Sequence, residues 1–398
     1  MAAHYHIWHH QDLDLKDPYD FVTLKIPNLD NTGTEPKKFQ SLRNDMAKLR
    51  QDGAKKGIVD PSVIHAQWST EGNELWALKV GKGSKHKVLF TGCHHAREWI
   101  SVEIPFLVAK YLIEGYTDHP GDDPEKKRIK HLVDNREIWF VPLVNPDGHL
   151  RSILLNRMWR PNTREHIFWN DETYTVNNIW GGSRTIQVKA GAYRGIDINR
   201  NYPTATWGIE ASSTSRDPAD TKKGTWVGPF ANSEVETQDM VELISQGFRA
   251  SMTYHNYAQY LLYPLQAEGD PFVKDLSKGM EGLINAKAEQ PYKLMSDAAQ
   301  YPTTGDLLEY CWQVAKGRPT FCTELRPLLK SPESVQFSGL PEEEIEPTFQ
   351  ENLNSALSVI NCAGFGGPAG SVTIPWTPGT HIGQVVRNCW KVFEGFPK

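Results

Sequence analysis

Apolar residues along the chain recur with the two periods that distinguish strands from helices. Short apolar runs predict strands at 75–80, 88–92, 138–144, 251–254, 261–263 and 320–325. The run at 138–144 is almost wholly apolar, which is typical of a strand covered on both faces. Apolar residues at helical spacing predict helices over 38–55, 101–112 and 343–360. This alternation predicts an α/β fold, a single domain with a mixed, twisted β-sheet and helices on both faces.

Several stretches interrupt this rhythm. Residues 165–194 and 208–230 are polar and rich in turn formers, so we expect long loops that border a functional cleft. Residues 1–37 are polar and weakly periodic, which favours an N-terminal arm. Residues 364–398 are rich in Gly and Pro but carry large aromatic residues, among them Trp376, Trp390 and Phe393, so we expect a C-terminal tail that packs on the domain. Ser233 and Glu236 have the spacing of a capping box, which predicts a helix start there.

The composition narrows the class of protein. The chain has 398 residues, 39% of them hydrophobic, and a net charge of -5, so it is expected to fold without binding nucleic acid. It contains no apolar run of the roughly 20 residues that a membrane helix needs. Its five Cys are sparse and odd in number, and its start lacks a secretory pattern. We therefore expect a cytoplasmic monomer, or a secreted protein if a leader has been removed.

The segment from Gly92 to Ile100, which reads GCHHAREWI, carries the most informative chemistry. It follows a predicted strand and is expected to open a helix, whose first turn would bring the side chains of His95 and Glu98 toward one point. Imidazole and carboxylate are ordinary zinc ligands, and a catalytic zinc needs three protein groups and an open position. With 14 His in the chain, this pair alone does not establish a site.

Three later segments supply the missing chemistry. Asp197 is followed closely by an Asn and an Arg, a combination suited to bidentate recognition of a carboxylate. His255 follows an apolar strand, and sites in α/β sheets gather at strand ends. Another apolar strand reaches Glu324. Each segment alone is more often structural than functional, so only their combination indicates a site.

Together and in this order, these segments resemble the zinc metallocarboxypeptidases of the carboxypeptidase A type. The resemblance runs from about Lys38 to Gly364 and rests on the HAREWI block, Asn145-Pro-Asp-Gly148, Asp197-x-Asn-Arg-Asn, His255-x-Tyr257, Tyr301 and Thr323-Glu-Leu325. It implies a zinc carboxypeptidase catalytic domain over residues 38–363. It also implies one Zn²⁺ per chain and peptide or protein C-termini as substrates.

The resemblance further implies a role for each matched residue. The zinc ligands would be His95, Glu98 and His255, with Asp197 orienting His95. Glu324 would be the general base that takes a proton from water and passes it to the leaving amine. The residues that contact the substrate would be Arg97, Tyr257, Asn199, Arg200, Tyr301 and Leu308. Among these, Asn199 and Arg200 would hold the terminal α-carboxylate and Tyr301 would close over the bound residue, which makes the enzyme an exopeptidase.

Two arginines are candidates for the residue that polarises the scissile carbonyl. In the family, a Trp-Arg pair is followed shortly by a second Arg that polarises this group. Here Trp159-Arg160 is followed by Arg164, with one residue more than usual between the two arginines. We expect Arg164 to take the role, with Arg160 as the alternative.

The residue at the floor of the specificity pocket also has two candidates. Matching residues 301–310 to the family pattern places Leu308 at the floor and favours large hydrophobic or aromatic C-terminal residues. Counting back from Glu324 places Glu309 there and favours Lys or Arg. We expect Leu308, because Glu309 and Tyr310 match the acidic–aromatic pair that follows the floor residue in the family.

Two other functions compete with this prediction. Relatives of the fold include amidases that act on peptidoglycan stems or modified amino acids, and a free carboxylate on such substrates would suit the same Asn and Arg. A catalytically silent binding module would usually lack a metal ligand or the base, and this chain keeps all four. The segment before the first matched helix is too short for a large inhibitory propeptide, so we expect a constitutively active enzyme.

Overall fold

The computed structural model describes residues 42–60, 65–83, 86–156, 158–177, 181–220, 224–315, 318–328 and 344–364. The predicted arm at 1–37 and almost all of the predicted tail at 364–398 lie outside the described residues. The prediction that the tail packs on the domain therefore stays a prediction.

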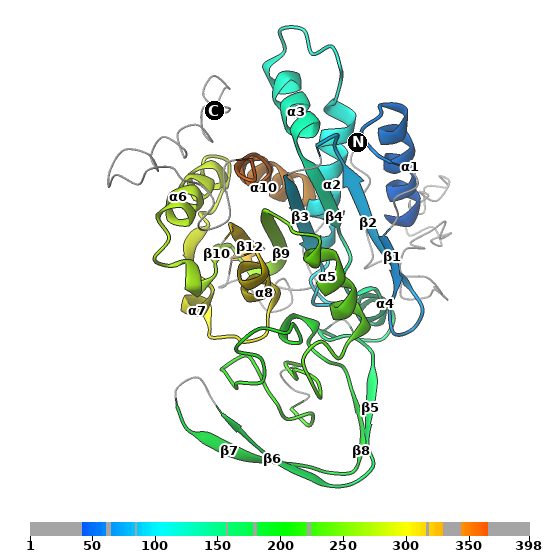
Figure 1. Cartoon of the computed structure of the whole chain (residues 1–398), viewed down its shortest axis with the longest axis vertical. Helices are drawn as coiled ribbons and strands as arrows, with labels where there is room; N and C mark the ends of the chain where they lie inside the picture. The colour runs from blue at the N-terminus through cyan, green and yellow to red at the C-terminus, as the bar shows by residue number, and fades with distance from the viewer. Residues whose placement is uncertain are drawn as a thin grey trace, which may run out of the picture.

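In the described part of the chain, eight strands form one mixed sheet in the order β1-β2-β4-β3-β9-β12-β10-β11 (Figure 1). They are β1 His65–Trp68, β2 Glu74–Val80, β3 Lys87–Gly92, β4 Glu137–Val141, β9 Ala250–Ala258, β10 Tyr260–Tyr263, β11 Lys293–Ser296 and β12 Thr320–Leu328. The central strands β4, β3, β9 and β12 pair in parallel, whereas β2 is antiparallel to β4 and β10 to β12. All six predicted strands belong to this sheet, which confirms the predicted α/β fold.

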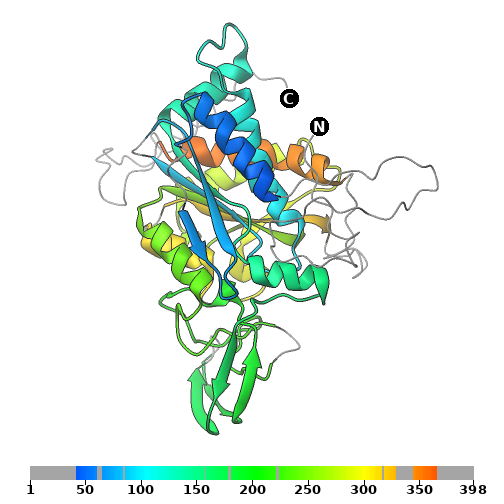
Figure 2. The same cartoon turned by 90° about the vertical axis from the view of Figure 1, so that its right-hand side faces the viewer.

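Helices cover both faces of the sheet, as Figures 1 and 2 show. They are α1 Leu42–Lys55, α2 Ile100–Gly115, α3 Pro124–Asn135, α4 Pro146–Leu154, α5 Val235–Ser245, α6 Pro271–Asn285, α7 Asp297–Gln300, α8 Leu307–Val314 and α10 Ile345–Cys362, with short 3₁₀ helices η1 Ile198–Arg200 and η2 Leu265–Ala267. Among the described residues, no helix combines the length and the apolar character required to cross a membrane.

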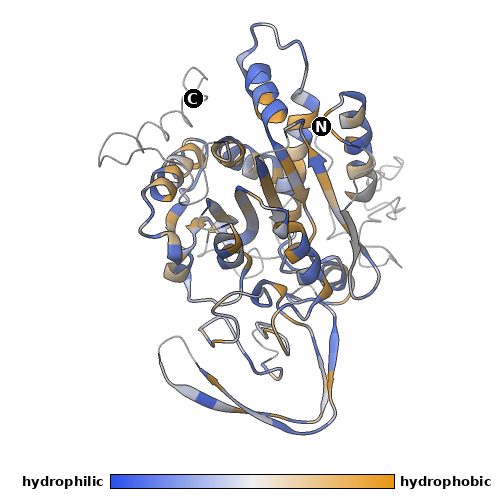
Figure 3. Ribbon diagram, in the orientation of Figure 1, coloured by the Kyte–Doolittle hydropathy of each residue, from blue (hydrophilic) through white to orange (hydrophobic). Residues whose placement is uncertain are grey.

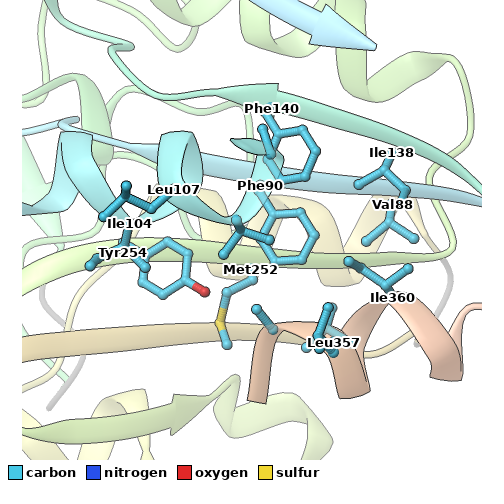
Figure 4. Packing of buried hydrophobic residues seen from close by; sticks show 14 of the residues in the cluster. Val88, Phe90, Ile104, Leu107, Ile138, Phe140, Met252, Tyr254, Leu357 and Ile360 are labelled. Carbon is cyan, nitrogen blue, oxygen red and sulfur yellow. The ribbon is translucent and has the colours of Figure 1, made fainter. Parts of the chain in front are cut away.

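Successive side chains of a strand point to opposite faces of the sheet, so the core consists of two layers. In β3, Val88 and Phe90 belong to a cluster with α2, α6 and α10, whereas Leu89 belongs to a cluster with α5 and α8 on the opposite face. Figure 4 shows the first cluster, where Phe90 stacks on Phe140 with ring centroids 5.2 Å apart. Full burial of each such side chain stabilises the folded state by about 1.5–3 kcal/mol. Apolar residues accordingly concentrate on the sheet and on the helix sides that face it (Figure 3).

The pattern of apolar residues did not predict every helix, and the helix starts show why. The unpredicted helices α3 and α6 both begin with Asp-Pro, and the carboxylates of Asp123 and Asp270 accept backbone N–H groups of the first turn. The helix start predicted near Ser233 is confirmed by α5, but the capping box predicted there is wrong. The N-cap of α5 is Glu234 and makes no side-chain cap bond, while the Ser233 hydroxyl donates to the Glu234 carboxylate instead.

The stretch predicted as a loop at 165–194 contains two antiparallel ribbons (Figures 1 and 2). One pairs β5 Glu165–Phe168 with β8 Gly191–Arg194, and the other pairs β6 Glu172–Asn177 with β7 Ser183–Val188. Their side chains are mostly exposed, so the sequence is polar, and a small cluster of Val176, Ile186 and Val188 supplies the buried apolar contacts. The second stretch, at 208–230, has only isolated bridges among its described residues.

Candidate active site

The chemistry-bearing residues gather at the carboxyl ends of the parallel strands. His95 and Glu98 follow β3, His255 lies in β9 and Glu324 lies in β12, where it is the register partner of His255. The prediction that the His95 segment opens a helix is wrong, because α2 begins only at Ile100. The segment is instead a tight turn in which the Glu98 N–H donates to the His95 carbonyl at 3.0 Å. That turn still directs the two side chains toward one point.

Three donor atoms converge at this point. His95 Nδ1 and His255 Nδ1 lie 2.7 and 2.8 Å from the two oxygens of Glu98, and 3.1 Å from each other. All three side chains are buried. A neutral imidazole pair and a carboxylate form a zinc donor set, and bonds of about 2.0–2.2 Å allow one ion to reach all three. The residues present therefore fit Zn²⁺.

Asp197 fixes the orientation of His95. Its Oδ1 lies 3.2 Å from His95 Nε2, so the proton of the neutral ring is placed on Nε2 and the lone pair on Nδ1. Asp197 is fully buried, and Arg160 donates to its Oδ2 through Nε and Nη2 at 3.0 and 2.9 Å. Burial raises the pKa of Asp197, but the charge of Arg160 and the hydrogen bond from His95 outweigh burial and hold that pKa well below its usual range.

The structure separates the two candidate arginines. Arg160 Nη2 lies 2.7 Å from His95 Nε2, and Arg160 Nη1 lies 3.8 Å from Glu98 Oε1. Arg164 donates instead to the carbonyl of Ser233 at 2.7 Å and is not beside the donor cluster. Between them, buried Asn162 binds the Ile196 N–H and the Glu234 carboxylate. Of the two candidates, Arg160 is thus the one that lies beside the donor cluster, and the role of either arginine at the scissile carbonyl stays a prediction.

A pocket next to the donor cluster contains the residues predicted to bind a terminal carboxylate. Its lining includes His95, His255 and Glu324 together with Asn199, Arg200, Tyr301 and Leu308. Arg200 is almost completely buried, and it donates to the carbonyls of Asn199 and Ser213 at 2.6 and 2.7 Å. The Asn199 Oδ1 accepts the Leu307 N–H at 2.9 Å, which leaves Nδ2 as the donor of that side chain.

Gly305 allows the chain to approach Arg200 closely. Its φ is +74°, and a Cβ at this position would lie 2.5 Å from the Arg200 carbonyl oxygen. Only glycine adopts this conformation without strain and without a clash. Gly305 therefore has a specific structural task, which is to let the pocket loop pack on the segment that contains Arg200.

The base of the pocket is apolar, with two carboxylates in its wall. Leu308 packs with Leu262 and Cys322, and all three line the pocket. Glu309, the alternative floor residue, does not line it, because its carboxylate accepts hydrogen bonds from the side chains of Thr206 and Gln313 at 2.6 and 2.8 Å. The two wall carboxylates, Asp297 and Asp306, were not predicted from the sequence, because they come from separate elements and belong to no motif.

Glu324 combines burial with access to the pocket. Its side chain is 7% exposed. Burial raises its pKa to about 7, although nearby His255 acts in the opposite direction. A carboxyl group with such a pKa exchanges protons readily near neutral pH, as a general base requires. Tyr301 shares the pocket, and burial raises the pKa of its phenol.

Arg97 and Tyr257 lie outside the lining of this pocket. Arg97 is mostly buried and donates to the Met158 carbonyl at 3.4 Å. Burial and the neighbouring charge of Arg160 lower the pKa of Arg97 to about 10. Tyr257 is half-buried near the end of β9, two residues after His255. Their predicted contacts with substrate stay predictions.

Comparison with known proteins bears on the same residues. The model of the zinc carboxypeptidase family (M14) matches residues 59–355, a span that contains every site residue described above. The chain belongs to the zinc carboxypeptidase family. Metallocarboxypeptidase A of Trichophyton tonsurans is 26% identical over 309 residues, which are 75% of this chain and 65% of that relative. Mast cell carboxypeptidase A of Homo sapiens is 28% identical over 298 residues, which are 72% of this chain and 61% of that protein.

Solved structures show the same fold. Carboxypeptidase A from Helicoverpa armigera superposes with a TM-score of 0.63 at 19% identity, covering 87% of this chain and 79% of that one. Thrombin-activatable fibrinolysis inhibitor also superposes with a TM-score of 0.63, at 21% identity and covering 81% and 74%. The matched region spans about 65% of the length of the first sequence relatives.

This member of the zinc carboxypeptidase family also carries a buried acidic cluster that was not predicted from the sequence. Glu236 is fully buried, and its carboxylate accepts hydrogen bonds from the Thr70 N–H and the Asn162 side chain at 3.2 Å each. Burial, followed by the charges of Asp147 and Glu234, raises the pKa of Glu236 from 4.5 to about 7. The folded chain therefore binds a proton here that the unfolded chain releases near pH 4.5. The stability associated with this proton is present below pH 4.5 and is lost as the pH rises through about 7.

The Glu236→Gln variant is expected to be more stable than the parent protein at pH 8 by roughly 1–3 kcal/mol, since a pKa unit corresponds to about 1.4 kcal/mol. The gain should shrink toward pH 5.5, where Glu236 is largely protonated. Urea unfolding at both pH values measures the difference, with exposed Glu172→Gln as the control. A gain of equal size at the two pH values would contradict the assignment.

Proposed function

We propose that this chain is a zinc-dependent exopeptidase that hydrolyses the C-terminal peptide bond of peptides and proteins. One observation carries the proposal. Two of the three convergent donors, His95 and His255, line one pocket together with the buried carboxylate of Glu324 and the buried guanidinium of Arg200. A hydrolytic centre and an anion-binding group thus lie within one residue-sized space.

The carboxylate-binding end of the pocket supports exopeptidase action. A terminal α-carboxylate presents two coplanar oxygens, which match the donor fork of a guanidinium. Arg200 is held in place by its bonds to Asn199 and Ser213, so this fork is ordered before substrate binds. An internal peptide bond offers no such anion, and its chain would have to continue through the end of the pocket.

Different side chains around the scissile bond transfer the proton and stabilise the developing charge. Bound zinc supplies Lewis-acid polarisation of the attacking water and of the scissile carbonyl. Glu324 takes a proton from that water on its carboxylate and delivers it to the nitrogen of the leaving amine. Arg160, the guanidinium placed beside the donor cluster, stabilises negative charge that develops on the carbonyl oxygen. Tyr301 covers the bound residue and limits the access of bulk water.

The lining of the pocket favours large hydrophobic or aromatic C-terminal residues. Leu308, Leu262 and Cys322 form its apolar base. Two substrates whose C-terminal side chains differ by one methylene group are discriminated by about 1–3 kcal/mol in such a pocket. Both acidic groups of the wall are engaged, because Asp306 accepts the Glu309 N–H and the Thr303 hydroxyl while Asp297 accepts the Leu265 N–H.

Release of the C-terminal residue from blocked dipeptides ending in Phe, Leu, Lys, Arg or Glu tests this proposal. Cleavage should be strongest for Phe or Leu, should stop with a chelator and should return with added zinc. A preference for Lys or Arg would keep the reaction but assign specificity to Asp297 and Asp306. A zinc-loaded protein that cleaves none of the dipeptides would contradict the exopeptidase proposal and favour the amidase alternative.

A further inference from the structure

A second groove, with a volume of about 650 Å³, adjoins the active site. Its inner end includes Arg97 and Arg160, and Arg160 contacts the donor cluster as described above. Its outer wall includes residues 192–195, which belong to or directly follow β8 of the projecting ribbon (Figure 1). The groove therefore joins the reaction centre to a part of the chain that the family motifs do not include.

The groove carries an excess of positive charge. Among the described residues, four arginines line it, at 97, 151, 160 and 194, together with one acidic residue, Asp220. Arg160 is already paired with buried Asp197. The Arg194–Glu165 pair is 3.2 Å long with both side chains 43% exposed, so it is weak and can be exchanged for another carboxylate.

Arg151 is the most available cation of the groove. Its guanidinium carbon lies 4.4 Å from the centre of the Trp159 ring, and in the described part of the chain no carboxylate pairs with it. A guanidinium stacked on an aromatic face is ordered, and its N–H groups remain at its edge for an anion. Trp159 thus holds Arg151 as a preformed carboxylate donor.

The outer wall is held in a fixed position. The Gly195 N–H donates to the Arg164 carbonyl at 2.9 Å, and Phe168 of the ribbon contacts both Tyr193 and Trp226 through its ring. Tyr193 and Trp226 themselves line the groove. A preformed aromatic and cationic surface binds a flexible peptide with a smaller ordering cost than a mobile loop does.

The position of the groove determines which part of a substrate reaches it. The cleaved residue occupies the pocket that contains Asn199 and Arg200, so the preceding residues must leave the reaction centre on another side. Arg160 contacts the donor cluster and also lines the groove. An extended peptide advances about 3.3 Å per residue. The groove therefore suits a short stretch of residues before the scissile bond.

We propose that this groove selects polypeptide C-termini that carry acidic residues shortly before the cleaved residue. The proposal rests on the proposed exopeptidase function, since it names the substrate class of that same site. Substrate carboxylates pair with Arg151 and Arg194, and the substrate backbone lies along Trp159 and Tyr193. Blocked dipeptides are too short to reach these arginines.

Hexapeptides ending in Phe, with Glu, Gln or Lys at the third and fourth positions from the C-terminus, test the proposal. We expect kcat/KM to be about tenfold higher for Glu than for Gln and lower still for Lys, with the differences shrinking in 0.5 M salt because the charges are partly exposed. Arg151→Gln and Arg194→Gln should each reduce the preference for Glu several-fold and leave dipeptide turnover unchanged. Lys189→Gln, on the same insert but outside the groove, is the control.

Binding of fluorescent hexapeptides to the metal-free protein, followed by anisotropy, gives a readout that does not depend on catalysis. Tighter binding of the Glu peptide that is lost in Arg151→Gln supports the groove even if no peptide is cleaved. Equal affinity and equal kcat/KM for the Glu and Lys peptides would overturn the groove proposal. If dipeptides were still cleaved in that case, the exopeptidase function would stand.

Discussion

Glu324→Gln is expected to lower kcat on a blocked dipeptide by roughly 10²–10⁴-fold, the range that a positioned general base contributes. Glutamine keeps the shape of the side chain but cannot accept a proton from the attacking water. The affinity for substrate should change little, because Asn199, Arg200 and the apolar base of the pocket are untouched. Steady-state kinetics at pH 7–8 with a substrate ending in Phe or Leu measures the loss.

Two controls make this result specific. Zinc content should remain one ion per chain, because Glu324 is not one of the three convergent donors. Glu309→Gln changes another buried glutamate only 15 residues earlier, whose carboxylate faces Thr206 and Gln313 and not the pocket. It should retain nearly full activity. Full turnover by Glu324→Gln would show that another group moves the proton.

Arg160→Lys should reduce kcat/KM by about 10²–10³-fold, as expected when a donor to the developing oxyanion is lost. Lysine keeps a positive charge near Asp197, so the buried carboxylate is not left without a counter-charge. It loses the fork whose Nε and Nη2 both donate to Asp197 while Nη1 lies near Glu98. Removal of the charge altogether, as in Arg160→Ala, should also destabilise the fold by roughly 3–5 kcal/mol.

Arg164→Lys is the matched control for this experiment. Arg164 lies four residues away and its guanidinium donates to the Ser233 carbonyl, away from the donor cluster, so its replacement should change kcat/KM less than about threefold. Thermal unfolding of both variants separates a loss of catalysis from a loss of folded protein. If Arg164→Lys were the more damaged enzyme, the assignment of the oxyanion role would be reversed.

The sequence was most informative where a run of residues is compatible with only one kind of environment. Apolar runs such as 138–144 have to be buried, so the strands of the central sheet were predictable. The zinc donors His95, Glu98 and His255 were predictable because their segments follow one another in the order of the family's motifs, and the structure brings them together. The Asp-Pro starts of α3 and α6 were readable signals that the hydrophobic pattern alone did not reveal.

Other features depend on distances that no local pattern specifies. The spacing of Arg160 and Arg164 did not reveal the direction of either side chain, since buried Asn162 determines how the loop turns between them. The polar stretch at 165–194 looked like a loop because its strands lie mostly in solvent, where a two-stranded ribbon needs few apolar residues. Asp297 and Asp306 reach one pocket from different elements, so neither could be related to it in advance.

The register between β9 and β12 has a consequence for how this scaffold can be changed. His255 and Glu324 are register partners on adjacent parallel strands, so their backbones are separated by the interstrand distance of a sheet, about 4.8 Å. Loop lengths elsewhere do not alter that distance. Surface segments such as 165–194 can accordingly be shortened, replaced or exchanged for segments of other proteins. Such changes leave the backbone spacing of Glu324 and His255 as it is.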